Sequence, residues 1–166
     1  MSDTQEKVNI LERSEIFLGL PNEVLKKIVT EVACENRIYK ANELIINFGD
    51  IAEELFIVME GKVDLMLVKS SSSSQNEVKI SMDTIRKGGT FGWSTLTGNN
   101  TYGLNAVCAE ETKVLAIDGQ ELLNFLDREP ATGYEIMKSL SRIVVLRLRD
   151  SNKVLFKYVS GKNIKP

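Results

Sequence analysis

The chain has 166 residues, 43% of them hydrophobic and 27% charged, and its 21 basic and 23 acidic residues leave a net charge of −2. This balance is typical of one globular domain and excludes the broad positive surface by which proteins bind nucleic acid or anionic membranes. No apolar run approaches the roughly 20 residues that span a bilayer, and the polar N-terminus is unlike a secretory signal. We therefore expect a cytoplasmic protein with no membrane contact and no direct nucleic-acid binding.

The chain contains no histidine, so the commonest general base and the commonest ligand of catalytic transition metals are missing. Cys34 and Cys108 lie far apart in the sequence and form no metal or redox motif. No motif pairs a serine or cysteine nucleophile with a base. The sequence therefore predicts no catalytic residue, no metal site and no enzymatic activity.

The N-terminal part of the chain is predicted to be helical. Residues 1–13 are expected to form a flexible or helical lead, and apolar residues then recur at helical spacing between residues 14 and 32. Ser14, Pro21 and Asn22 are residue types that start helices, so we expect helices to begin at these positions.

Between about residues 37 and 118 the apolar residues alternate with polar ones, which predicts about eight short strands. The clearest pair is the hairpin at 54–68, where two alternating runs flank the turn Glu60-Gly61. The serine-rich stretch 69–77 is predicted to be a loop, because it has too little apolar surface to fold. The last pair of strands is predicted at 102–109 and 112–118.

The helical period returns after residue 118. A short helix is expected to end near Pro130, and a long helix to run from there to about Val159. Helices, then strands, then helices favour an antiparallel β-roll with helices at its ends, related to the double-stranded β-helix and the jelly roll. We therefore expect a mainly β fold of about eight strands with N-terminal helices and a long C-terminal helix.

Residues 88–107, GGTFGWSTLTGNNTYGLNAV, are rich in glycine and contain a short strand and a turn. They resemble the phosphate-binding cassette of the cyclic nucleotide-binding domain family, which includes the sensor domains of catabolite-activator-type regulators. The family pattern is approximately Gly-Glu-x-Phe-Gly-Glu-Leu-Ala-Leu, a short turn, and then Arg-x-Ala-x-Val. The run Gly88-Gly89-Thr90-Phe91-Gly92 carries its first part, but the family glutamate falls on Trp93 and the family arginine on Tyr102 or Gly103.

The resemblance covers approximately residues 14–150. It implies a domain at 14–160, with the roll at about 37–118, the C-terminal helices at about 119–159 and a tail at 161–166. Catabolite-activator-type regulators carry a helix-turn-helix domain at this point, and none fits in the tail. The resemblance therefore implies a divergent, stand-alone member of the family that acts as a sensor or regulatory module.

The resemblance also implies a ligand site in the cassette, where the family arginine holds the cyclic phosphate and the glutamate holds the ribose. The residues expected to line it are Phe91, Gly92, Trp93, Ser94, Thr95, Leu96, Thr101, Tyr102, Gly103 and Asn105. No Arg or Lys lies between Lys87 and Lys113, so the cassette offers backbone N–H groups and hydroxyls but no cation. Because burial of an uncompensated phosphate is costly, we expect cyclic AMP and cyclic GMP to bind weakly or not at all, unless Arg86, Lys87 or Lys113 reaches in.

Two interpretations of the altered cassette stay open. In the first, Trp93 and Tyr102 contact a cyclic nucleotide or a less charged small ligand, and the chain is a sensor. In the second, the two side chains fill the roll, and the chain is a ligand-free scaffold that binds an unidentified protein partner. An open pocket would favour the first interpretation, and a pocket filled by these side chains would favour the second.

The long C-terminal helix carries an apolar stripe that is wider than one docking face needs. In the family this helix pairs with its twin, so the resemblance implies a homodimer. The residues expected at this interface are Ile136, Met137, Leu140, Ile143, Val144 and Leu148.

Overall fold

The structure is a computed structural model that describes residues 2–69, 78–98 and 101–162. These residues form four α-helices, one short 3-10 helix (η1) and eight strands. The elements in chain order are α1 (Asp3–Arg13), α2 (Asn22–Glu31), β1 (Cys34–Tyr39), β2 (Leu44–Ile46), β3 (Glu54–Glu60), β4 (Lys62–Lys69), β5 (Val78–Arg86), β6 (Thr90–Phe91), η1 (Trp93–Leu96), β7 (Asn105–Cys108), β8 (Thr112–Asp118), α3 (Gly119–Arg128) and α4 (Pro130–Lys162). The predicted serine loop, beyond its first residue, and the end of the predicted tail lie outside the described residues.

The N-terminal helices differ from the prediction at one boundary. The side chain of Ser2 accepts a hydrogen bond from the backbone N–H of Gln5 and so caps the start of α1. Ser14 ends α1, because its backbone N–H and its hydroxyl both donate to the carbonyl of Leu11. The prediction that a helix starts at Ser14 is therefore wrong, whereas α2 begins at Asn22 as predicted.

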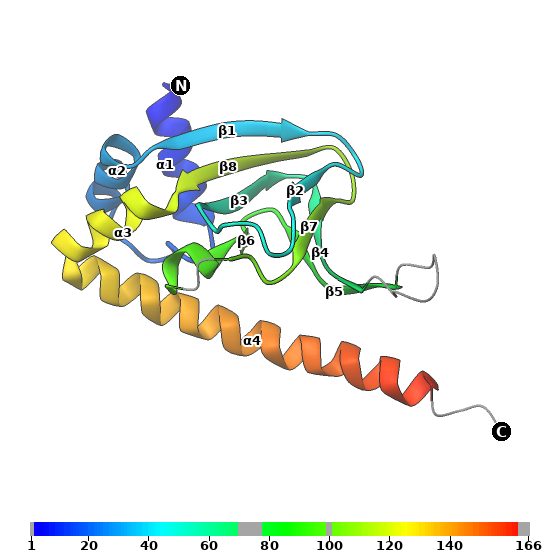
Figure 1. Cartoon of the computed structure of the whole chain (residues 1–166). Helices are drawn as coiled ribbons and strands as arrows, with labels where there is room; N and C mark the ends of the chain where they lie inside the picture. Colours follow the sequence, from blue (N-terminus) through cyan, green and yellow to red (C-terminus); the bar gives the residue numbers. More distant parts are fainter. Residues whose placement is uncertain (1, 70–77, 99–100, 163–166) are drawn as a thin grey trace.

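Two antiparallel four-stranded sheets form the roll (Figure 1), with strand orders β1-β8-β3-β6 and β2-β7-β4-β5. This arrangement confirms the predicted mainly β fold with helices at its ends. β8 spans the predicted residues, but β7 is shorter than the predicted strand at 102–109. The backbone of Tyr102 bonds instead to Gly49 and Asp50 in the loop before β3, which keeps it out of β7.

Strand β3 is buried on both faces, and its side chains alternate between two cores. Leu55 and Ile57 belong to a core under the helices, whereas Phe56 and Val58 belong to the core inside the roll. β8 divides in the same way, with Leu115 and Ile117 under the helices and Val114 and Ala116 inside the roll. The two central strands therefore hold the helical layer and the roll together.

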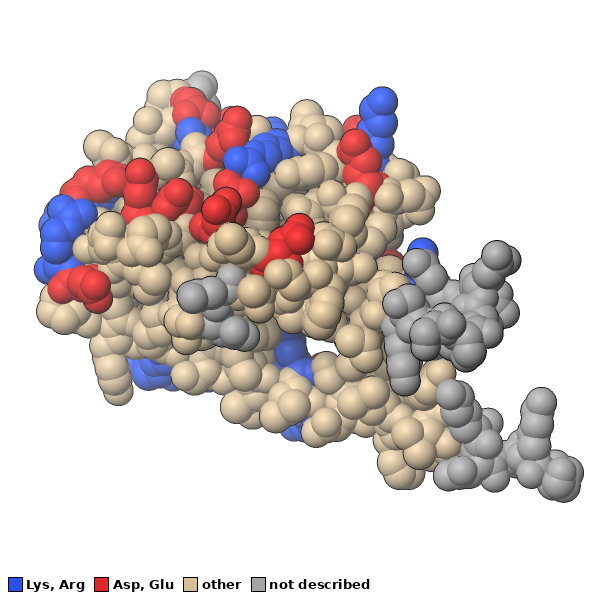
Figure 2. Space-filling view, viewed as in Figure 1, with Lys and Arg blue, Asp and Glu red and all other residues tan. Residues whose placement is uncertain are grey.

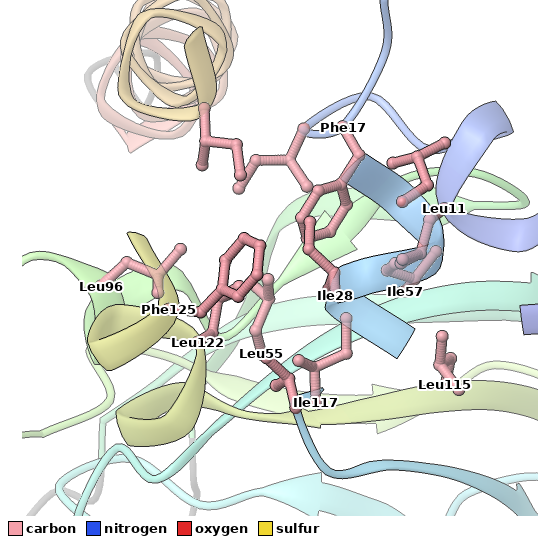
Figure 3. Packing of buried hydrophobic residues seen from close by; sticks show 14 of the residues in the cluster. Leu11, Phe17, Ile28, Leu55, Ile57, Leu96, Leu115, Ile117, Leu122 and Phe125 are labelled. Carbon is pink, nitrogen blue, oxygen red and sulfur yellow. The ribbon is translucent and has the colours of Figure 1, made fainter. Parts of the chain in front are cut away.

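The helical core lies between the helices and the outer face of the β1-β8-β3-β6 sheet (Figure 3). Figure 3 shows Phe17, Ile28 and Phe125 gathered near Leu55 on β3. Leu96 from η1 belongs to the same core and is 5% exposed. The short helix that follows the predicted cassette turn is therefore anchored in the packing of the N- and C-terminal helices.

Charge is divided unevenly between α4 and the rest of the chain. Residues 130–162, which form α4, hold seven basic and two acidic side chains, whereas residues 1–129 hold 13 basic and 21 acidic ones. Figure 2 shows acidic side chains gathered above α4 on this face, while the charged side chains visible on α4 itself are basic. A net charge close to zero therefore conceals two parts of opposite charge.

Helix α3 begins in direct contact with η1. Its first residue, Gly119, donates its backbone N–H to the carbonyl of Glu53 at 2.8 Å. A β-carbon on Gly119 would lie 1.8 Å from Oγ1 of Thr95, whose side chain is buried. Only glycine fits at this position, so the start of α3 and the cassette helix are fixed against each other.

Replacing Gly119 by alanine is expected to lower the free energy of unfolding by about 1–3 kcal/mol, because Thr95 or the start of α3 must move to make room. The shift of the urea midpoint at constant slope measures this loss. Gly103→Ala is the matched control, because a β-carbon on Gly103 meets nothing within 4 Å. Equal losses in the two variants would contradict the proposed contact.

Candidate functional site

The cassette backbone runs from β6 through Gly92 into η1. Gly92 has a φ of +82°, and a β-carbon there would lie 2.7 Å from the carbonyl oxygen of Glu54, so this turn requires glycine. Phe91 is fully buried and stacks on Phe56, with ring centroids 5.0 Å apart. The steric fit of Gly92 and the packing of Phe91 therefore help to hold the turn in shape.

A hollow of about 170 Å³ lies beside this turn. Small-molecule sites usually measure about 300–1,000 Å³, so this hollow is small for a ligand site. The residues that line it are Ile46, Leu65, Gly92, Trp93, Ser94, Tyr102, Gly103 and Leu104. None of these residues is charged, so among the described residues no cation faces the hollow to receive a phosphate.

The hollow collects half of the residues predicted for the ligand site: Gly92, Trp93, Ser94, Tyr102 and Gly103. The side chains of Phe91, Thr95 and Leu96 are buried instead. Thr101 pairs with Ile51, and the side chain of Asn105 accepts a hydrogen bond from the N–H of Phe48. The hydroxyl of Thr101 and the amide of Asn105 are therefore not brought to the hollow.

Three apolar residues complete the lining of the hollow, and sequence reasoning did not assign them to the site: Ile46, Leu65 and Leu104. Ile46 lies on β2 and Leu65 on β4, in the sheet opposite β6. Their alternating pattern showed that they belong to strands, but it carried no information about which strands face the cassette. Only the closure of the two sheets into a roll brings them together.

Tyr102 fills part of the interior of the roll. Its side chain is 8% exposed, and its hydroxyl donates to the carbonyl of Glu54 at 2.8 Å and accepts from the backbone N–H of Glu54 at 3.0 Å. Burial raises the pKa of this phenol, so it stays protonated at neutral pH. These two hydrogen bonds connect the start of β3 to the cassette. They use the hydroxyl of Tyr102 on the protein's own backbone.

Trp93 stands between two hollows. Its indole N–H donates to the carbonyl of Thr90 at 3.3 Å, and the guanidinium carbon of Arg147 lies 5.2 Å from the centroid of the ring. The second hollow measures about 220 Å³, lies between α4 and the roll, and shares Leu65, Trp93 and Leu104 with the first. The indole therefore forms part of the wall between the two hollows, together with Leu65 and Leu104.

The cations considered as replacements for the family arginine lie elsewhere. Arg86 and Lys87 line a separate hollow beside the end of α1, and Lys113 pairs with Glu6 at 3.4 Å. The cation that reaches Trp93 is Arg147 of α4. Sequence reasoning did not select Arg147, because nothing in the local pattern of a long helix tells which of its arginines turns toward a distant loop.

A larger hollow of about 610 Å³ lies next to the start of α3. Glu53, Glu54 and Asp118 line it. Glu54 accepts two hydrogen bonds of 2.7 Å from Arg37, and Asp118 caps α3 by accepting from the N–H of Glu121 at 2.8 Å. Carboxylates dominate this hollow, so it disfavours an anionic phosphate despite its size.

The predicted dimer residues on α4 fall into two groups. Ile136, Leu140 and Ile143 are at most 7% exposed and pack in the helical core of their own domain. Met137 and Val144 are partly buried, and Leu148 is 59% exposed. Further exposed apolar side chains follow along the helix: Val145, Leu155, Phe156 and Val159. Leu148 is therefore the most exposed of the six residues, and the exposed apolar surface of α4 continues beyond it.

The described residues contain no group of three or more His, Cys, Asp or Glu placed to hold a metal ion. Within the same residues, none of the helices has the length and apolar character needed to cross a membrane. Cys34 and Cys108 are free thiols, and burial raises the pKa of Cys34 to about 11. A thiol with so high a pKa is a poor nucleophile at neutral pH.

Replacing Tyr102 by phenylalanine is expected to lower the free energy of unfolding by about 1–3 kcal/mol at neutral pH, because both backbone groups of Glu54 lose a partner. The raised pKa adds a pH dependence of definite sign. The unfolded chain ionises this phenol near pH 10 and the folded chain only above that value, so the advantage of the wild type is complete below about pH 10 and shrinks as the pH rises further. Urea denaturation at several pH values measures both effects.

The control for this variant is Tyr134→Phe, because the side chain of Tyr134 is 67% exposed. That variant should match the wild type at every pH. If Tyr102→Phe were as stable as the wild type at neutral pH, the structural role of the phenol would be refuted.

The comparisons with known proteins agree with this fold. A family model described as the cyclic nucleotide-binding domain matches residues 36–129. The cyclic AMP receptor protein of Thermus thermophilus is 24% identical to the chain over 142 residues, which make up 86% of the chain and 61% of that relative. The chain thus spans less than two thirds of the length of this curated relative.

Solved structures show the same fold. A cyclic nucleotide-binding domain from Methylobacillus flagellatus superposes with a TM-score of 0.70 at 15% identity, over 98% of this chain and 85% of that one. The catabolite activator protein of Thermus thermophilus superposes with a TM-score of 0.64 at 25% identity, over 88% of this chain and 63% of that one. Since the family model covers more than half of the sequence, the chain belongs to the cyclic nucleotide-binding domain family.

Proposed function

We propose that the chain is a regulatory module of this family whose cassette binds cyclic AMP and cyclic GMP weakly or not at all. The observation that carries the proposal is the hollow beside Gly92, which measures about 170 Å³ and has no charged residue among the described residues that line it. Tyr102, one of the two residues at which the family arginine falls, uses its hydroxyl on the backbone of Glu54, and the other, Gly103, has no side chain. The site thus has neither the room nor the cation that a cyclic phosphate needs.

The energetic cost supports weak binding. A cyclic phosphate carries a negative charge, and burying it without a partner costs several kcal/mol. Loss of an arginine contact to a buried anion costs about 2–5 kcal/mol, which lowers affinity by a factor of about thirty to several thousand. Backbone N–H groups at the start of η1 still favour an anion, but a helix of four residues offers little of the charge that is missing.

The cassette is built to transmit movement to the C-terminal helices whatever occupies it. Gly119 of α3 touches Thr95, and Leu96 shares a core with Leu122 and Phe125 of α3. An occupant changes the position of α3 only if it binds the two positions with different affinity. Within this proposal the chain regulates a partner in the cytoplasm, is not an enzyme, and makes no direct contact with nucleic acid.

A second function, that of a ligand-free scaffold, is supported by one observation. Tyr102 belongs to the core inside the roll, so the protein itself fills space that a ligand would use. A small uncharged ligand in the remaining hollow is the alternative, because its walls are mainly apolar. Thermal shift across a panel of uncharged metabolites separates the two functions, since only a bound ligand raises the melting temperature.

Isothermal titration of the wild-type chain with cyclic AMP and cyclic GMP is expected to give dissociation constants above about 1 mM. A value below about 10 μM would overturn the proposal.

The double variant Trp93→Glu/Gly103→Arg restores both family groups, and a β-carbon on Gly103 meets nothing within 4 Å. We expect this variant to bind at least about tenfold more tightly than the wild type. Thr101→Arg is the control, because Thr101 is exposed and does not line the hollow.

We further propose that the chain forms a homodimer through α4. Met137, Val144, Leu148, Leu155 and Val159 recur along the helix at intervals of seven and four residues, which is the spacing of a helix-pairing seam. Leu148 and Val159 are more than half exposed, so the domain's own core leaves the distal part of this seam uncovered. A second copy of α4 would cover the exposed stripe.

The double variant Leu148→Glu/Leu155→Glu is expected to be monomeric in sedimentation velocity at protein concentrations that keep the wild type dimeric, because it puts charges into the apolar seam. Leu146→Glu is the matched control. Leu146 is 53% exposed but lies two residues from Leu148, on another side of the helix, and should leave the dimer intact. A wild-type chain that stays monomeric at high micromolar concentration would refute the interface.

A further inference from the structure

The distal half of α4 leaves the helical core and lies along the roll (Figure 1). Ile136, Leu140 and Ile143 anchor the first half of the helix in the core. From Val144 to Ser160 no residue of α4 is fully buried. Any firm attachment of this half must therefore come from a few specific contacts, and Arg147 makes the most extensive of those observed.

Four groups surround the guanidinium of Arg147. It donates to the carbonyl oxygen of Thr90 at 2.5 Å and to Glu15, it lies 3.4 Å from a carboxylate oxygen of Asp83, and it faces the ring of Trp93 at 5.2 Å. The side chain is only 13% exposed. Burial lowers the pKa of Arg147 and the two carboxylates oppose that effect, so the guanidinium stays charged at neutral pH.

These four groups come from separate parts of the chain, and hydrogen bonds connect three of them to one another. Glu15 lies between α1 and α2, and it accepts hydrogen bonds from the N–H and the hydroxyl of Thr90 at 2.7 and 2.9 Å. The carbonyl of Thr90 accepts from both Arg147 and the indole N–H of Trp93. One arginine thus joins α4 to the N-terminal segment, to β5 and to the first residues of the cassette.

We propose that Arg147 is a positioning residue that latches the distal half of α4 to the cassette and holds the indole of Trp93 in place as part of the wall between the two hollows. Release of the latch frees α4 beyond Ile143 and lets the hollows of about 170 and 220 Å³ join. Because the coupling is an equilibrium property, a change at Trp93 must loosen α4 as a change at Arg147 loosens Trp93. The latch operates whether or not the cassette binds a nucleotide.

Hydrogen exchange of the full chain tests the latch without any ligand. In Arg147→Gln, amides at 144–158 are expected to exchange at least about fivefold faster than in the wild type, while β3 and β8 stay protected. The fluorescence of Trp93, the only tryptophan in the chain, is expected to shift as the indole loses its cation. Arg142→Gln is the matched control, because Arg142 is an exposed arginine on the same helix.

Reciprocity separates a latch from an ordinary ion pair. Trp93→Leu removes the aromatic ring but changes no residue of α4. It is expected to speed the hydrogen exchange of the amides at 144–158 as well. Glu15→Gln and Arg147→Lys weaken the latch from either side while keeping similar shapes, and they provide the same test if Arg147→Gln does not fold. The proposal is overturned if Arg147→Gln exchanges like Arg142→Gln, or if Trp93→Leu leaves 144–158 unchanged. Neither result bears on nucleotide affinity, so this proposal and the proposed function fail independently.

Discussion

The burial of β3 and β8 on both faces is the constraint on which the rest of this structure depends. Neighbouring residues of these strands, such as Leu55 and Phe56, enter different cores. A slip of one residue in their pairing would exchange the two sets of side chains, so the register has little freedom. β6 pairs with β3 where Phe91 meets Phe56, and the position of the cassette is therefore set by the same strand.

This dependence explains how a cassette can keep its shape without the groups that hold a cyclic nucleotide. The left-handed turn at Gly92 is required by the nearby carbonyl of Glu54, and Phe91 is required by its stack on Phe56. These needs are steric and belong to the fold. A charged pair for ribose and phosphate would be needed only by the ligand, so side chains at 93 and 102 can change without loss of the frame. The glycines of such a motif therefore indicate how the backbone packs more directly than they indicate which ligand binds.

The fold was largely predictable from the sequence, because apolar periodicity of two and of 3.6 residues directly records which surfaces are buried. The error at Ser14 has a local cause: serine suits both ends of a helix, and here it bonds back to Leu11. The cassette turn was also predictable, but its surroundings were not. Arg147 and Leu65 reach it from distant elements, and a single sequence holds no record of such contacts.

Tyr102 shows why the site was harder to predict than the fold. The sequence places the family arginine on this residue or on Gly103 and leaves the role of Tyr102 open, since a tyrosine can face a ligand or fill a core. The structure turns it inward, where its hydroxyl finds both a donor and an acceptor on Glu54. The outcome depended on whether a buried phenol could satisfy its hydrogen bonds, and that is a property of the assembled roll.

The opposite charges of α4 and of the rest of the chain have a consequence for how this molecule meets others. A body with a net charge of −2 is weakly attracted or repelled as a whole, yet one with a basic rod on an acidic body has a large permanent dipole. Near a charged surface such a dipole experiences a torque, which favours orientations that turn α4 toward negative charge. Salt shortens the range of this alignment to about 8 Å at physiological ionic strength. In this protein, a change in ionic strength therefore alters the electrostatic orientation of the molecule more than its net electrostatic attraction.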